Sequence, residues 1–138
     1  ADRTVLIGQR DAAEAYAMAA SCDLILVGIG TAVPQAELVT TGMVSAEEMA
    51  AISQAGGVGE ILGHFFDAKG RPVENELTRR IITQPLETLR NRRIIAIAGG
   101  DIKIPAIRAV LASGLLDGLI TDERTAMSVI ETSRGSAQ

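Results

Sequence analysis

The stretch RIIAIAGGDIKIPAIRAVLAS, residues 93–113, decides the fold class, because it joins two different hydrophobic patterns through a pair of glycines. Residues 93–98 form a nearly continuous run of isoleucine and alanine, which predicts a buried strand. Residues 104–113 carry apolar side chains at helical spacing, with Pro105 in the first turn and Gly114 as the stop signal. The stretch therefore predicts a strand, a glycine turn and a helix, in that order.

The same kinds of pattern recur on both sides of this stretch. An almost unbroken apolar run at 23–30 predicts a strand that is buried on both faces. Ser45 and Glu48, three residues apart, predict a capping box at a helix start, and Asp11 is the expected N-cap of an alanine-rich helix. Further strands are expected at 4–8, 79–83 and 116–122, a strand running into a turn at 59–74, and helices at 11–21, 45–53, 85–91 and 123–131.

Strands that alternate with helices of this length predict a parallel sheet with right-handed crossovers. We therefore expect an α/β fold, with a parallel, Rossmann-like sheet and flanking helices. No linker or internal repeat divides the chain, so residues 1–138 are predicted to be a single domain. Because the chain begins without methionine and enters an apolar run at once, we expect it to be the C-terminal portion of a larger domain.

The composition narrows the class of protein. The chain has 138 residues, 47% of them hydrophobic, and a net charge of −4. With no basic run and no aromatic stripe, it lacks the features of a nucleic-acid-binding surface. Its single cysteine, Cys22, cannot form an internal disulfide, and we expect a buried thiol in a reducing, cytoplasmic protein. No stretch approaches the roughly 20 apolar residues that a membrane-spanning helix needs.

Two glycine loops follow predicted strands, at the place where open α/β sheets bind ligands. The loop at 27–33 resembles part of a dinucleotide-binding fingerprint. However, Val33 stands where the third glycine belongs, and Pro34 interrupts the segment that follows. We therefore expect no nicotinamide cofactor, and the sequence indicates no other cofactor.

The loop at 98–103 is the stronger candidate for a ligand site. Asp101 is the expected N-cap, and Lys103 lies in the first turn, where the helix dipole favours an anion. A lysine is unfavourable there unless an anion joins it, so Lys103 is either a phosphate ligand or a solvated side chain. Glu60 follows Gly59 in an apolar run and is either solvent-facing or an acceptor for sugar hydroxyls.

The sequence contains no strong pattern for metal binding or nucleophilic catalysis. His64 has no acidic or cysteine partner at ligand spacing, which disfavours a metal site. No serine or cysteine stands in a nucleophile-elbow pattern. We therefore expect no catalytic residue and no metal. Thr40, Thr41 and Gly42 either line a pocket or form a turn.

Three segments together resemble a known family. They are CDLILVGIGT (22–31), TGMVSAEEMAAISQAGGVGEILGHFFDAKGRPV (41–73) and the run from RRIIAIAGG to LITDERTA (92–126). In order and spacing they look like the effector-binding domain of the SorC family of bacterial sugar-responsive transcriptional regulators. That resemblance implies the fold shared with glucosamine-6-phosphate deaminase and ribose-5-phosphate isomerase, whose parallel sheet binds phosphorylated sugars at its loops.

The resemblance also implies roles for individual residues. It makes Lys103 a phosphate or sugar ligand and Glu60 an acceptor for hydroxyls. The TDE segment at 121–123 becomes the start of the last helix. The full set of ligand-binding residues implied in this way is Gly28, Gly30, Thr31, Glu60, Gly99, Gly100 and Lys103.

The family's domain is about twice as long as this chain, and its first half carries another phosphate loop. The resemblance also implies that the protein is a homo-oligomeric sensor that binds a sugar or sugar phosphate. Such a sensor would act on DNA only through a helix-turn-helix outside this chain. One alternative is an isomerase or deaminase on the same fold, but the glycine loops lack the carboxylate–histidine pairing that would supply a general base. A dimerisation module with a vestigial pocket is the third possibility.

Overall fold

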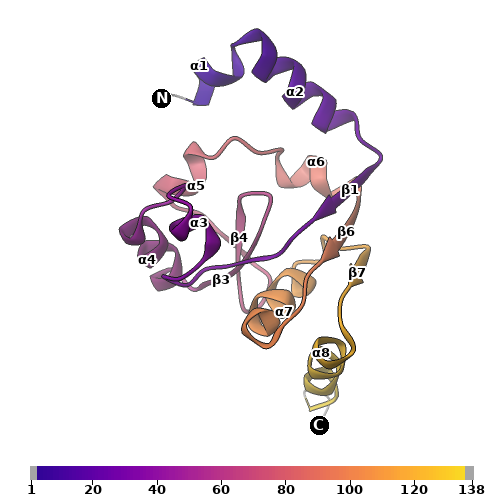
Figure 1. Cartoon of the computed structure of the whole chain (residues 1–138). Coiled ribbons are helices and arrows are strands. Elements are labelled where there is room, and N and C mark those ends of the chain that lie inside the picture. Colours follow the sequence, from indigo (N-terminus) through magenta and orange to yellow (C-terminus); the bar gives the residue numbers. More distant parts are fainter. Residues whose placement is uncertain (1–2, 136–138) are drawn as a thin grey trace.

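The computed structural model describes residues 3–135 and contains a parallel three-stranded sheet, in the order β1-β6-β7 (Figure 1). Its strands are β1 (Leu24–Val27), β6 (Arg93–Ile97) and β7 (Gly118–Ile120). Val27 lies opposite Ala96, which lies opposite Leu119. This sheet and its flanking helices confirm the α/β fold that the alternating patterns predict.

The middle of the chain forms a second, antiparallel sheet in the order β2-β3-β4-β5. The sequence predicts one strand running into a turn at 67–70 in this region. That turn is present, with the Gly70 N–H donating to the Asp67 carbonyl over 2.9 Å, but a tight hairpin precedes it in place of a single strand. Leu62 and Gly63, with φ of 50° and 80°, form the two-residue turn between its strands. The strands of this sheet are β2 (Gly30–Thr31), β3 (Gly57–Ile61), β4 (His64–Asp67) and β5 (Pro72–Val73).

Helix α7 (Ile104–Ala112) packs between the two sheets and forms the centre of the core. Ile107 and Val110 of this helix are fully buried against Ile94 and Ala96 of β6 and against Phe66 of β4. A second apolar cluster lies under α4 (Ala46–Gln54), whose capping box joins Ser45 and Glu48 as predicted. The other helical segments are α1 (Arg3–Ile7), α2 (Arg10–Ser21), α3 (Glu37–Thr40), α5 (Glu76–Arg80), α6 (Leu86–Arg90), η1 (Asp101–Lys103) and α8 (Glu123–Gly135).

Two of the predicted strands are wrong. Residues 4–8 lie mostly in α1, where the N–H of Gly8 donates to the Thr4 carbonyl, and no described strand lies beside them to pair with. Residues 79–83 lie partly in α5, because Asn75 and Thr78 form a capping box that starts a helix there. In both places the β-branched residues favour a strand locally, but pairing and capping decide the outcome.

Three finer expectations are also wrong. Strand β1 is not buried on both faces: Leu24 and Leu26 are 49% and 60% exposed, because the described elements cover only one side of its sheet. Cys22 is exposed rather than buried. Gln9, not Asp11, is the N-cap residue of α2. Asp11 lies in the first turn, where its carboxylate interacts favourably with the helix dipole.

Candidate functional site

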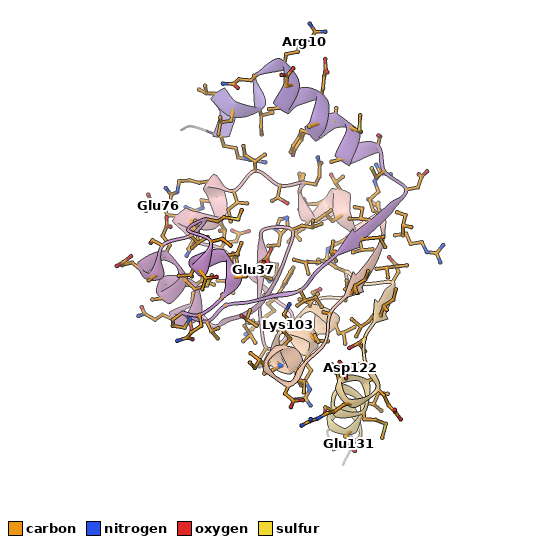
Figure 2. All side chains as sticks on the ribbon, in the orientation of Figure 1. Arg10, Glu37, Glu76, Lys103, Asp122 and Glu131 are labelled. Carbon is orange, nitrogen blue, oxygen red and sulfur yellow. The ribbon has the colours of Figure 1, made fainter. Side chains whose placement is uncertain are left out.

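A cavity of about 330 Å³ lies where β1 ends and the chain turns into β2. Its walls come from this turn, from α3 and the residues after it, from β3, and from the start of α7. Five of the seven predicted ligand residues line it together: Gly28, Gly30, Thr31, Glu60 and Lys103. Figure 2 shows the side chains as sticks and labels two of the lining residues, Lys103 and Glu37.

Glu60 owes its position to the register of the small sheet. It stands opposite Gly30 of β2 and opposite Phe65 of β4. Its Oε1 accepts a hydrogen bond of 2.6 Å from the N–H of Gly63 in the hairpin turn. A Cβ at Gly30 would lie only 2.5 Å from Glu60 Oε2, so the glycine leaves space for the carboxylate over the β2 backbone.

Burial and charge act against each other on Glu60. Removal from water raises the pKa of its carboxyl, while the Gly63 N–H and the nearby charge of Lys103 lower it. Because a half-buried carboxylate is costly unless it has partners, its place at a cavity is typical of a functional group. In chemical terms, Glu60 offers acceptor oxygens to a ligand hydroxyl.

Lys103 lies at the N-cap position of α7, one residue before the first turn in which the sequence placed it. Its N–H donates to the Gly100 carbonyl over 3.0 Å, which fixes the backbone of the short 3-10 turn before the helix. Pro105 occupies the first turn, as predicted. The Lys103 side chain therefore adds a positive charge to the dipole of the helix N-terminus, beside the cavity.

Gly99 and Gly100 do not line this cavity. The N–H of Gly100 donates to Thr125 Oγ1 over 2.9 Å, and a Cβ at Gly99 would lie 2.4 Å from Asp122 Oδ2. Thr125 also donates to Asp122 Oδ2 over 2.7 Å, and these hydrogen bonds lower the pKa of the Asp122 carboxyl. The two glycines thus lie against the beginning of α8, and their predicted ligand role stays a prediction.

The sequence predicts Asp101 as the N-cap of α7, and this prediction is wrong, because Lys103 is the N-cap residue. Asp101 forms an ion pair of 2.8 Å with Arg124 of α8. The N-cap of the 3-10 turn is Gly100, whose φ of 101° suits glycine alone. This contact fixes the loop to α8 rather than to a ligand.

The segment between β2 and α4 contributes five lining residues, which are Ala36, Glu37, Leu38, Thr41 and Met43. Thr41 Oγ1 donates to the Glu37 carbonyl over 2.7 Å, closing the turn that the threonines suggested. No sequence signal points to Glu37. Together with Glu60 and Lys103, it gives the described lining two carboxylates and one ammonium group.

A larger cavity of about 650 Å³ adjoins the first and is mostly apolar. The two share Leu38, Met43 and Glu60. Because Glu60 is the charged residue of the larger cavity, the polar chemistry lies in the smaller one. His64 lies outside both and donates through Nε2 to the Gln84 carbonyl over 2.8 Å, so it forms no pair with Glu60.

Among residues 3–135, no helix is long and apolar enough to span a membrane, and no group of three or more histidine, cysteine or acidic side chains is arranged to hold a metal ion.

Comparison with known proteins identifies the family of this chain. The family model described as "Putative sugar-binding domain" matches residues 1–131. The chain is 50% identical over 134 residues to the erythritol catabolism regulatory protein EryD of Brucella abortus, covering 97% of this chain and 42% of that protein. It is therefore less than half the length of this curated relative.

Solved structures agree with the sequence match. A DeoR family transcriptional regulator from Listeria monocytogenes superposes with a TM-score of 0.83 at 26% identity, over 92% of this chain and 52% of that one. The full-length sorbitol operon regulator SorC from Klebsiella pneumoniae shares the fold, with a TM-score of 0.76 at 22% identity, over 92% of this chain and 42% of that one.

These similarities confirm the resemblance that the glycine loops and the middle segment indicate. The relatives named above are described as a regulatory protein, a transcriptional regulator and an operon regulator, which favours a regulator over the isomerase alternative. With a family model matching almost its whole length, the chain belongs to the sugar-binding domain family, and its solved relatives include regulators described as DeoR family and SorC family.

Proposed function

We propose that this chain is the effector-binding part of a cytoplasmic transcriptional regulator that senses a small polyol, sugar or sugar phosphate. The observation that supports this most directly is the convergence of Lys103, Glu60 and the Gly28–Thr31 turn on one cavity of about 330 Å³. An ammonium group and a carboxylate at a cavity of this size suit a compact, hydroxyl-rich ligand.

Each lining group has a distinct role in this proposal. Glu60 accepts hydrogen bonds from ligand hydroxyls through the oxygen that lies over Gly30. Lys103 donates to a phosphate or to a hydroxyl beside the α7 N-terminus. Gly28 lets the ligand approach the backbone closely, because nothing lies within 4 Å of the position that a Cβ would take there, whereas the Glu60 carboxylate occupies the corresponding space over Gly30.

EryD, whose name refers to erythritol catabolism, guides the choice of ligand. A four-carbon polyol or its phosphate carries several hydroxyls for Glu60 and, when phosphorylated, an anion for Lys103. Ligand binding would favour one arrangement of a homo-oligomer and so change the affinity of a separate DNA-binding domain.

The test is thermal protection of the full protein by erythritol, erythritol phosphate, ribose phosphate and glucose phosphate. At a hundredfold excess over the dissociation constant, a true effector stabilises the folded state by about 2.7 kcal/mol. We expect phosphorylated compounds to protect more than their unphosphorylated forms. Equal, negligible shifts for all of them would contradict an effector site.

The enzyme alternative is tested on the same samples. An isomerase or deaminase would convert a sugar phosphate to its isomer or release ammonia, and that activity would need a general base near the sugar. We expect neither product above background. A rate that disappears in Glu60→Gln would instead identify Glu60 as that base.

A further inference from the structure

The two carboxylate oxygens of Glu60 have different surroundings in the ligand cavity. Its Oε1 accepts the hydrogen bond from the Gly63 N–H, and its Oε2 lies over the backbone of Gly30. The Gly63 N–H therefore decides which oxygen of Glu60 is left for a ligand. Whatever fixes Gly63 in place also fixes the acceptor that the cavity presents.

Gly63 lies in a hairpin turn whose conformation is unfavourable for the residue before it. The turn consists of Leu62 and Gly63, and both have a positive φ, of 50° and 80°. Two-residue turns of this kind favour asparagine or aspartate before glycine, because these residues tolerate the left-handed conformation. Leucine tolerates it poorly, and its side chain offers no hydrogen bond in return. The turn therefore needs support from outside the hairpin.

The segment between α5 and α6, residues 81–84, provides that support. Thr83 Oγ1 donates a hydrogen bond to the Leu62 carbonyl. A Cβ at Gly63 would lie 2.6 Å from Ile81 Cγ2, so the Ile81 side chain is packed closely against the turn. In Figure 1, the chain between α5 and α6 passes the end of the β3–β4 hairpin. One hydroxyl thus holds the carbonyl of the strained residue.

The 81–84 segment is itself fixed from two sides. The Gln84 carbonyl accepts a hydrogen bond of 2.8 Å from His64 Nε2, at the start of β4. The Thr83 carbonyl accepts one of 3.2 Å from the Tyr16 hydroxyl of α2, and Gln84 Nε2 donates to the Tyr16 carbonyl over 2.8 Å. Because these bonds fix the backbone on both sides of the Thr83 side chain, its hydroxyl is held in place as a donor.

We propose that Thr83 is a positioning residue for the ligand site. Its hydroxyl holds the turn at Leu62, the turn aims the Gly63 N–H at Glu60 Oε1, and Oε2 is thereby left for the ligand. Thr83 does not line the ligand cavity, so it acts only through the turn. The effect on binding rests on the proposed function, whereas the positioning of Glu60 does not.

The first test separates the hydroxyl from the shape of the side chain. Thr83→Val removes the donor and keeps the branched shape, and Thr83→Ser keeps the donor. The probe is whichever of erythritol, erythritol phosphate, ribose phosphate and glucose phosphate protects the full protein best. We expect Thr83→Val to bind it about three- to tenfold more weakly, which corresponds to the loss of one hydrogen bond.

Two variants serve as controls for this measurement. Thr88→Val makes the same substitution on α6, where the side chain lines neither the ligand cavity nor the larger one. Thr83→Ser and Thr88→Val should both bind within about twofold of the parent. A loss of affinity in Thr83→Ser as large as that in Thr83→Val, or no loss in Thr83→Val, would overturn the proposal.

A double-mutant cycle shows whether Thr83 acts through Glu60. Glu60→Ala removes the carboxylate, so the turn has nothing left to position. In that background we expect Thr83→Val to change affinity by less than about twofold. A residue that only supports the fold would cost the same factor in both backgrounds. The same three- to tenfold loss with and without Glu60 would therefore contradict the positioning role.

The last test contains no ligand. Hydrogen exchange of the Gly63 N–H in the full protein, followed by NMR, reports on its bond to Glu60. We expect this exchange to be about three- to tenfold faster in Thr83→Val and unchanged in Thr83→Ser and Thr88→Val. An unchanged rate in Thr83→Val would overturn the proposal, whether or not any compound binds. If no compound binds the parent while the Gly63 exchange responds as expected, the proposed function fails and the positioning of Glu60 stands.

Discussion

Gly30 and Gly59 lie on neighbouring strands, and we expect an alanine substitution to affect a different property at each: effector binding at Gly30 and folding stability at Gly59. A Cβ at Gly30 would lie 2.5 Å from Glu60 Oε2, which is the end of a flexible side chain. A Cβ at Gly59 would lie 2.6 Å from the Ala106 carbonyl oxygen and 3.0 Å from the Ala106 Cα, both in the backbone of α7. The carboxylate can move aside, but the helix backbone can yield only by moving away from β3.

The magnitudes follow from that difference. We expect Gly59→Ala to cost about 1–3 kcal/mol of stability, the usual effect of overpacking a core. For a domain of 150–250 residues, each kcal/mol corresponds to about 2–4 °C in melting midpoint. Gly30→Ala should change stability by less than about 0.5 kcal/mol, because reduced freedom of the unfolded chain offsets the local crowding.

The effect of Gly30→Ala should appear in binding instead. Moving the Glu60 carboxylate loses a hydrogen bond to a charged group, which we expect to weaken effector binding by about 1.5–3 kcal/mol, or roughly tenfold to a hundredfold. Thermal melts and isothermal titration of the full protein measure the two effects. If Gly30→Ala costs as much stability as Gly59→Ala, the Glu60 carboxylate is a fixed structural group and our reasoning is refuted.

Two further predictions concern pH and the α8 start. The folded-state pKa of Glu60 lies above its ordinary value of 4.5, so the folded protein binds more protons and stability falls as pH rises above 4.5 through that folded pKa. Glu60→Gln should remove this loss of stability. In thermal melts between pH 4 and 8, the melting midpoint of Glu60→Gln relative to that of the parent should therefore rise with pH. A difference in midpoint that stays constant would contradict the raised pKa. Thr125→Val removes the acceptor for the Gly100 N–H and should cost about 1–2 kcal/mol in chemical denaturation. Effector affinity should not change, and a loss of affinity without a loss of stability would give Gly100 a ligand role.

The strand–turn–helix at 93–113 could be predicted from sequence because each local signal agrees with the burial. Ile94, Ala96, Ile107 and Val110 are all fully buried, so the hydrophobic pattern and the tertiary packing favour the same structure. The capping box at Ser45 is local in the same sense. Where only a β-branched run indicated a strand, as at 4–8, no strand among residues 3–135 pairs with it, and the segment forms a helix instead.

The site could be predicted only in part, because it depends on contacts far apart in the sequence. Glu60 reaches the cavity through a hairpin register that a two-residue turn sets. Glu37 joins it from an exposed segment with no sequence signal. Likewise, the glycine loop gave no indication that Thr125, 25 residues further on, accepts a hydrogen bond from Gly100.

The central claim is that Lys103 faces an anionic or hydroxyl-rich effector, and one titration tests it most directly. The full protein, Lys103→Ala and Lys69→Ala are titrated calorimetrically with the sugar or polyol phosphate that protects best, and each is melted without ligand. Lys69 lies in the exposed turn before β5 and loses the same charge, so it is the matched control. We predict that Lys103→Ala weakens binding by about 1.5–3 kcal/mol with an unchanged melt, while Lys69→Ala changes neither. Binding by Lys103→Ala as tight as that of the parent would contradict the account.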